Sequence, residues 1–479
     1  MKIKNISFIL VVLALSLSFA SCEKWIDIEP QQSLSQEEAL VSIKDHKAAL
    51  LGIYSLTRSE DYYGQAFTVL PDIMSDNASI TTVNNGAYTS LYDYTFHTGT
   101  YEVRDFWTEA YRIVANANNI INSMNDKKFE GDLLESERNH VLGETYALRG
   151  IALFDIAKTF ASAYNPATAA STPGIPVVTT TSKDIFPARA TLLESYKQIT
   201  EDLEQAAKLL LVAETTDEET VDNNRIGYVA VKAMLTRVYL AMKDYDKVIS
   251  TYNDIKGNIE LALNADDYAK IWGESVSPEI LWQIEITTKD SSPQIGWVYW
   301  YDVKERPDYV ATSEIMGLYS TDDYRKSVCY KKEGSRWTVR KYITNPSVGL
   351  SGVNNIKVIR TAEVVLNAVE AYIAKTDATA KTLFAELYEA RRPGVTFDNT
   401  ISDADLKIAY NNERRAELAF EGQRWFDLKR NGADMVRIPT EGASAGAAKT
   451  IVSTSKYWNW PIPTSELNAN KNLVQDSKW

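Results

Sequence analysis

The densest charged stretch of the chain, Glu413 to Arg430, holds the residue types that general acid and base catalysis uses. Acids recur every four residues at Glu413, Glu417 and Glu421, and Gly422 follows as a helix stop. The second part surrounds an apolar anchor with charges: Trp425, Phe426 and Leu428. An acid and base pair is one interpretation. Acids and bases alternate with no nucleophile nearby, which favours the other interpretation, an internally paired structural network.

Other catalytic patterns are weaker. The histidines, His46, His97 and His140, are far apart and lack a second ligand at helical spacing, so we expect no metal site, triad or cofactor. Gly442 to Gly446 matches the nucleophile-elbow pattern, but the apolar strand that should precede its serine is missing. No Gly-x-x-x-x-Gly-Lys loop occurs to cradle a phosphate. Glycosidase chemistry needs only two carboxylates, and 64 acidic residues leave that alternative open.

Aromatic side chains offer a different chemistry. The apolar faces of sugar rings stack on Trp and Tyr, while amides, acids and arginines bond the hydroxyls. The segment from Ser291 to Tyr309 has four rings in five residues between Gly, Pro and Ser positions. The ligand-binding candidates are therefore Trp297, Tyr299, Trp300 and Tyr301, with Tyr92, Tyr94, Asp72, Asp76, Asn77 and Arg306 as weaker ones. Five other rings are assigned to core packing: Trp107, Tyr239, Tyr245, Trp272 and Trp282.

Helical periodicity predicts the elements that must position these residues. A first helix is expected from Ser35 to Leu56, with Ser35 and Glu38 as a capping box. Further helices are predicted over 106–121, 135–160, 192–211, 361–375, 378–391 and 403–421.

Arg225 to Ile255 has the large-residue spacing of a tetratricopeptide helix-turn-helix, with Lys243 and Asp244 in the turn. Similar two-helix patterns over 103–160 and 361–391 indicate degenerate repeats that pack as a helical layer. A plain helical bundle is the alternative.

Other stretches lack helical signals. Thr57 to Arg104 is long for a loop, and within it Tyr92, Tyr94 and Phe96 alternate as on one face of a strand. Glu279 to Ile286 also alternates like a strand, and the tail from Tyr457 to Pro463 is expected to be extended.

The leader and the overall charge limit where the chain can act. Lys2 and Lys4 precede an apolar run that is too short to span a bilayer, and small residues come before Cys22, as in an export signal. Cys22 at that position resembles a bacterial lipobox, which implies its acylation; ordinary cleavage with Cys22 incidental is the alternative. The 479 residues carry a formal net charge of −13 without a basic run, which argues against a nucleic-acid partner.

Several motifs, in this order along the chain, resemble the SusD/RagB family of glycan-binding outer-membrane lipoproteins. They are the leader ending at Cys22, Glu144 to Gly150, Val358 to Leu366 with Glu370 and Ala371, Arg391 and Arg392, Glu413 to Arg430, and Trp460 to Pro463 followed by Glu466, Asn470 and Gln475. The departures are small: Ala161 where Gly is usual, Val369 where Ala is common, and Asp476 where Asn is common.

The resemblance implies a mainly α fold of tetratricopeptide-like helix-turn-helix pairs, a SusD-like superhelix, with an irregular, partly β ligand-binding half. It divides the chain into a signal peptide, 1–21, and one SusD-like domain, 22–479. The N-terminal part of that domain, 22–225, includes the long loop 57–104, and the C-terminal part is 226–479. It implies a surface lipoprotein of the outer membrane, anchored through Cys22. Such a protein binds oligosaccharide or polysaccharide, has no catalytic residue, and passes its ligand to a SusC-like TonB-dependent transporter. A tetratricopeptide scaffold that binds proteins is the runner-up.

Overall fold

Helices dominate the computed structural model. It describes residues 40–126, 134–182, 184–216, 222–273, 276–287, 289, 294–299, 306–342, 344–345, 350–351, 354–438 and 448–479. Within these residues, no helix combines the length and the apolar character needed to cross a bilayer.

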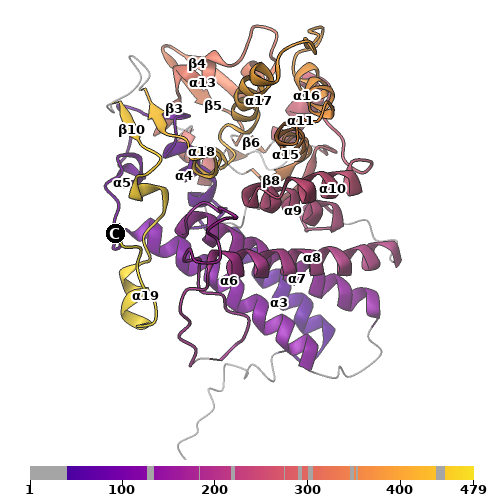
Figure 1. The fold of residues 1–479 in the computed structure, drawn as a ribbon, viewed down its shortest axis with the longest axis vertical. Coiled ribbons are helices and arrows are strands. Elements are labelled where there is room, and N and C mark those ends of the chain that lie inside the picture. The colour runs from indigo at the N-terminus through magenta and orange to yellow at the C-terminus, as the bar shows by residue number, and fades with distance from the viewer. Residues whose placement is uncertain are drawn as a thin grey trace, which may run out of the picture.

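Long helices build the first half of the chain. They are α3 (Ile43–Thr57), α6 (Tyr101–Asp126), α7 (Glu135–Phe160) and α8 (Leu192–Thr216), with α7 packed against the other three (Figure 1). The helices predicted over 106–121, 135–160 and 192–211 are confirmed. The first helix begins at Ile43 because Ser42 and Asp45 form its capping box. The predicted capping pair, Ser35 and Glu38, lies outside the described residues.

The tetratricopeptide-like pair is confirmed. α9 (Tyr228–Met242) and α10 (Tyr245–Ile255) pack on each other, and Lys243 makes the turn with a φ of 61°. Asp244 then caps α10 by accepting from the Lys247 N–H at 3.2 Å. A second pair, α15 (Thr361–Ala374) and α16 (Thr379–Ala390), continues the layer, since α15 contacts both α9 and α10. The predicted helix-turn-helix layer is therefore present.

The strands are short and pair in antiparallel fashion, and β2 is one that joins distant parts of the chain. The predicted strand within Glu279 to Ile286 is β2 (Ile280–Ile284), which pairs with β8 (Ile356–Arg360). The other elements of the second half are α11 (Ala265–Trp272), α12 (Gln294–Tyr299), β3 (Tyr309–Ala311), α13 (Ser313–Gly317), α14 (Arg325–Cys329), β4 (Tyr330–Glu333), β5 (Arg336–Val339), β6 (Thr344–Asn345), β7 (Leu350–Ser351), α17 (Asp403–Leu418), α18 (Arg424–Asn431), β9 (Met435–Arg437), β10 (Lys449–Ile451), the 3-10 turn η2 (Lys456–Trp458) and α19 (Thr464–Ala469).

The segment from Thr57 to Arg104 differs from its prediction. It holds α4 (Ala66–Ile73), β1 (Ala78–Ile80) and α5 (Thr89–Tyr92). The strand predicted from Tyr92, Tyr94 and Phe96 is wrong, because Tyr92 ends α5 and Tyr94 adopts a φ of 56°, which breaks an extended chain. The alternation arises because all three rings turn into the core. All eight residues of α4 are buried, and the helix is short and contains Pro71, which in a sequence argues against a helix.

The tail returns to the helical layer. The chain is extended from Asn459 to Pro463 as predicted, although η2 replaces its first residues, and the Trp460 N–H donates to the Thr159 carbonyl at 3.0 Å. The packing predicted for five rings is confirmed: Trp107, Tyr239, Trp272 and Trp282 are buried, and Tyr245 is partly buried against the same core.

Replacing either of two helical glycines by alanine should change the free energy of unfolding, in opposite directions at the two positions. At Gly143 of α7 an added Cβ would lie 2.7 Å from Leu210 Cγ, whereas at Gly52 of α3 it would meet nothing within 4 Å. Gly143→Ala should therefore lower the free energy of unfolding by about 1–3 kcal/mol through overpacking. Gly52→Ala, the matched control, should raise it by about 0.5–1 kcal/mol through helix propensity. Urea unfolding measures both, and changes of the same sign would contradict this packing.

Candidate functional site

The charged stretch from Glu413 to Arg430 is a buried ionic network. Glu417 of α17 lies at its centre and accepts from three arginines. Arg325 donates at 2.8 Å, Arg391 at 2.9 Å and Arg360 at 3.0 Å. These four side chains are 0–1% exposed.

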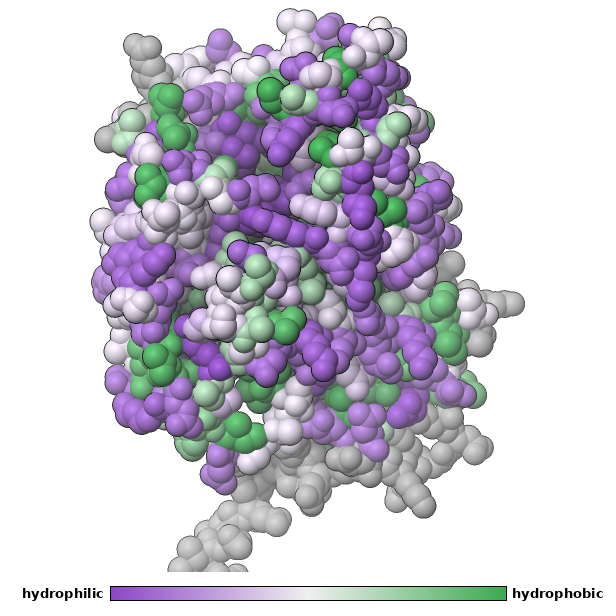
Figure 2. Space-filling view, viewed as in Figure 1, coloured by the Kyte–Doolittle hydropathy of each residue, from purple (hydrophilic) through white to green (hydrophobic). Residues whose placement is uncertain are grey.

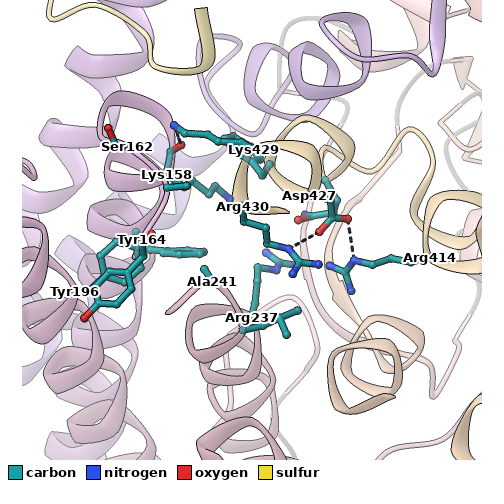
Figure 3. Close-up of a pocket in the computed structure, with 15 residues that line it drawn as sticks. Lys158, Ser162, Tyr164, Tyr196, Arg237, Ala241, Arg414, Asp427, Lys429 and Arg430 are labelled. Carbon is teal, nitrogen blue, oxygen red and sulfur yellow. Dashed lines mark hydrogen bonds and ion pairs between the residues drawn. The ribbon is translucent and has the colours of Figure 1, made fainter. Parts of the chain in front are cut away.

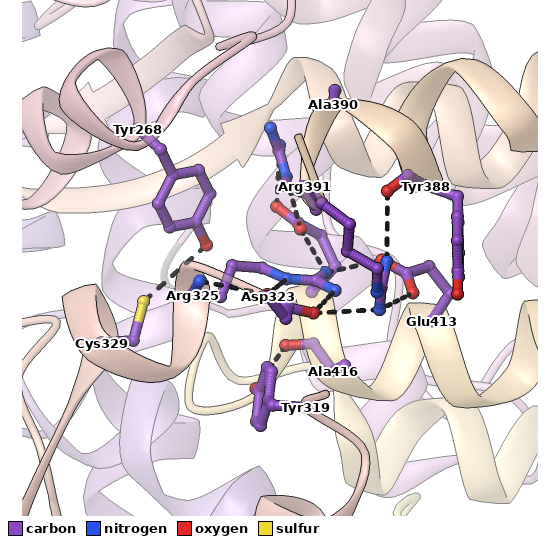
Figure 4. Close-up of polar contacts among 12 residues, drawn as sticks. Tyr268, Tyr319, Asp323, Arg325, Cys329, Tyr388, Ala390, Arg391, Glu413 and Ala416 are labelled. Carbon is purple, nitrogen blue, oxygen red and sulfur yellow. Dashed lines mark hydrogen bonds and ion pairs between the residues drawn. The ribbon is translucent and has the colours of Figure 1, made fainter. Parts of the chain in front are cut away.

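Further acids surround the same arginines. Glu279 accepts from Arg391 at 2.9 and 3.0 Å and also from Arg360. Asp323 and Glu413 complete the other side, where they pair with Arg325 and Arg392 (Figure 4).

This pairing decides between the two interpretations of the stretch. Burial alone would raise the pKa of Glu417, but the charges of Arg391, Arg360 and Arg325 hold that pKa well below its ordinary value. A carboxylate held ionised by three guanidinium groups is a poor proton acceptor near neutral pH. The structural interpretation of the network is confirmed.

A cavity of about 40 Å³ lies beside the second part of the stretch (Figure 3). Asp427 on its wall accepts from Arg414 at 2.8 Å and Arg430 at 2.9 Å. Burial would raise the pKa of Asp427, but Arg414 and Arg430 lower it to about 2. Lys429 donates at 2.7 Å to the carbonyls of Lys158 and Ala161 at the end of α7, and burial lowers its pKa to about 7. Asp427 and Lys429 already have partners within the protein. We therefore interpret the cavity as a small packing gap between these elements and not as a ligand site.

The remaining catalytic candidates form no site among the described residues. No three His, Cys, Asp or Glu side chains of that part of the chain come together as metal ligands. His46 is buried against Ser42 and Ser123, and the Gly442 to Gly446 pattern lies outside the described residues.

Six of the ten predicted ligand-binding side chains are in the interior: Tyr92, Tyr94, Tyr299, Asp72, Asp76 and Asn77. Tyr299 packs on Phe420 and donates to the Val69 carbonyl at 3.4 Å, and Tyr94 donates to the Met74 carbonyl. A sugar cannot stack on a ring that has no exposed face. The structure therefore gives these three rings packing roles.

The three buried polar candidates tie β1 to the turn between α17 and α18. Asp72 accepts at 2.9 Å from the N–H groups of Phe420 and Gly422, and burial raises its pKa to about 6. Asp76 accepts from Arg424 at 2.7 and 2.8 Å. Asn77 accepts from Arg415 at 2.9 Å. Their hydrogen-bonding capacity is used inside the protein.

The long segment from Thr57 to Arg104 and the aromatic segment from Ser291 to Tyr309 are nevertheless neighbours. β1 pairs with β3 in the register Ala78 to Ala311, which brings the turn after β1 against residues 306–308. The Asn85 N–H donates to the Asp308 carboxylate at 2.8 Å, and the Thr81 hydroxyl donates to the Pro307 carbonyl at 2.6 Å. A link to α12 follows, since the Asp308 N–H donates to the Val298 carbonyl at 3.0 Å.

We name the resulting exposed region the loop surface; its described members are Thr82, Asn84, Asn85, Gly86, Arg306 and Arg336. Arg336 reaches it from β5 by donating to the Thr82 hydroxyl at 3.3 Å. The Trp297 backbone lies in α12, and its side chain, with Trp300 and Tyr301, is outside the described residues. A ligand role for these three rings stays a prediction.

The polar half of the loop surface was missed by sequence reasoning. Thr82, Asn84 and Asn85 lie in a polar run that ends at Gly86, and such a run in the middle of a long non-helical segment is a turn signal. That signal indicates an exposed turn that carries amide side chains.

Two family models divide the chain between them. The model described as "Starch-binding associating with outer membrane" matches residues 24–240, and the model described as "SusD family" matches residues 268–479. The chain belongs to the SusD/RagB family. Membership of this carbohydrate-binding family supports glycan binding.

Similar SusD proteins match over nearly the full length. "SusD-like protein P38" of Formosa agariphila is 23% identical over 99% of this chain and 99% of its own. A SusD superfamily crystal structure from Bacteroides thetaiotaomicron is 25% identical with a TM-score of 0.80, covering 91% of this chain and 99% of that one. A crystal structure titled "Putative sugar binding protein" from Bacteroides vulgatus has the same identity and TM-score and covers 92% of this chain and 99% of that one.

Removing the charge of Glu417, at the centre of the network, should destabilise the second half of the protein. Glu417→Gln removes one charge among three buried arginines, so the free energy of unfolding should fall by about 3–5 kcal/mol. Asp403→Asn, on the exposed first turn of the same helix, should change it by less than about 1 kcal/mol. Chemical denaturation followed by circular dichroism measures both. Equal, small effects would mean that the network does not hold the fold.

Proposed function

We propose that this protein is a surface lipoprotein of the outer membrane that captures oligosaccharide or polysaccharide and passes it to a TonB-dependent transporter. The observation that carries the proposal is the match of both family models, the first of them described by starch binding and association with the outer membrane. The full-length likeness to SusD proteins adds support, since the whole fold is shared.

The loop surface is the binding site that we favour. It offers the exposed amide of Asn85 and guanidinium groups at Arg306 and Arg336, which suit the hydroxyl groups of a sugar chain, while the Asn84 side chain bonds within the turn. Trp297, Trp300 and Tyr301 belong to the adjoining segment and are proposed as the rings on which sugars stack. Figure 2 shows a mostly hydrophilic face with hydrophobic side chains in separate small groups.

The placement of the acidic side chains favours binding of a glycan over its hydrolysis. The most concentrated acids of the described chain are ion-paired in the network, where they are shielded from solvent. The described members of the loop surface are basic, amide, hydroxyl and glycine residues, and the neighbouring Asp308 is buried and accepts from the Asn85 N–H. A pair of carboxylates on either side of a glycosidic bond, which hydrolysis requires, is therefore not formed there by the described residues.

Binding should be weak and should depend on the loop surface. One sugar stacked on one ring contributes about 1 kcal/mol, so the dissociation constant should lie roughly between millimolar and micromolar. Titration calorimetry against soluble α-glucan, β-glucan, xylan and mannan oligosaccharides should find a ligand. Trp300→Ala and the double variant Asn85→Ala, Arg306→Ala should each weaken it about fivefold or more.

Arg112→Ala, on an exposed part of α6, is the control and should bind as the unchanged protein does. Binding that survives both loop variants would exclude this surface. If no glycan binds and the protein instead copurifies with a soluble protein partner, the tetratricopeptide scaffold reading of the helix pairs is correct.

Anchoring is tested separately. The acylated Cys22 should appear in the mass spectrum of the mature protein as an N-terminal peptide that carries fatty acyl groups. Cys22→Ser should move the protein from the membrane fraction to the soluble fraction without changing its glycan affinity. An unmodified N-terminus at Cys22 or beyond would show that the leader is an ordinary export signal.

A further inference from the structure

A second cleft lies against the helical layer, away from the loop surface. It has a volume of about 590 Å³ and is enclosed by α6, by the connection between α7 and α8, and by α19. Figure 1 shows α19 and β3 well apart along the long axis of the molecule, so the cleft and the loop surface are separate places. Its volume falls within the roughly 300–1,000 Å³ of small-molecule sites.

The backbone that forms the walls of the cleft is fixed on both sides. Along α6, the Tyr111 hydroxyl donates to the Pro176 carbonyl at 2.8 Å and the Asn118 amide donates to the Val178 carbonyl at 2.9 Å. From the tail, the Asn470 amide donates to the Pro187 carbonyl at 2.8 Å. These hydrogen bonds fix the backbone of the connection, whose side chains line the cleft.

Two hydrophobic side chains on this wall remain open to solvent. Phe186 is 54% exposed and Ile185 is 38% exposed, although the carbonyl of Phe186 is held by the Asn472 amide at 2.7 Å. Trp107, which is 4% exposed, and the half-buried Tyr111 lie opposite on α6, with ring centroids 4.8 Å apart. The Phe186 ring is thus carried by a fixed backbone at the edge of the cleft, where it is free to stack on a ligand.

Polar groups on the same walls have unused hydrogen-bonding capacity. The side-chain hydroxyls of Thr180 and Thr181 and the carboxylate of Glu466 line the cleft, and none makes a hydrogen bond or ion pair within the described part of the chain. The cleft can thus stack on the apolar face of a ligand and also bond its hydroxyl groups.

We propose that this cleft is a second saccharide-binding site, which would take a short stretch of a neutral oligosaccharide. A sugar has both an apolar ring face for Phe186 and hydroxyl groups for Thr180, Thr181 and Glu466. A fatty acyl chain would leave those three polar groups without partners, and an anionic ligand would meet the Glu466 carboxylate. The inference rests on the proposed glycan-binding function, and two sites on one protein would raise its avidity for a polysaccharide.

The test locates the ligand with 19F NMR of protein labelled with 5-fluorotryptophan. The Trp107 signal is assigned with Trp107→Phe, and the labelled protein is titrated with the oligosaccharide panel named above. A ligand in the cleft should shift the Trp107 signal in a saturable manner. Phe186→Ala should weaken that binding at least fivefold, and Thr181→Val, which keeps the side-chain shape, should weaken it about threefold or more.

Ile408→Ala is the control, since Ile408 is exposed on α17, outside both sites. It should leave the shift unchanged, as should Trp300→Ala, which is aimed at the loop surface. If a glycan binds calorimetrically while the Trp107 signal stays still or Phe186→Ala has no effect, the cleft proposal is overturned and the proposed function stands. If no glycan binds by either method, both fail.

Discussion

The structure depends on the burial of Glu417 among Arg325, Arg360 and Arg391. A charge in the interior is tolerated only when it is paired and hydrogen-bonded, so the elements that carry these side chains must meet. Those elements are α17, α14, the end of β8 and the end of α16. The network therefore fixes the irregular second half around α17, which packs on α15 of the helical layer.

The same helix also positions the loop surface. The turn that follows α17 gives the N–H groups of Phe420 and Gly422 to Asp72, and Arg424 binds Asp76. These contacts hold β1, and the pairing of β1 with β3 brings Asn85 to Asp308. A chain of buried polar contacts thus runs from the network to the loop surface.

The sequence predicted what local patterns control. Helical periodicity located α6, α7, α8 and the α9–α10 turn, and the alternation of charges identified the network as internally paired. Partners distant in sequence could not be predicted. The sequence around Asp72 and Asp76 does not show whether these carboxylates contact a sugar or the residues near position 420. Tyr92 and Tyr94 alternate because a tight turn buries both rings. The loop surface depends on the register between β1 and β3, which no local pattern specifies.

We propose that the buried ionic network holds exposed loops that bind glycan and itself takes no part in binding. Hydrogen exchange followed by mass spectrometry, with and without a saturating oligosaccharide from the panel, is the test. Ligand binding should slow exchange in residues 81–87 and 306–309 and leave α17 and α18 unchanged. Slower exchange concentrated in α17 and α18, with the loops unaffected, would contradict it and would place the ligand at the charged network.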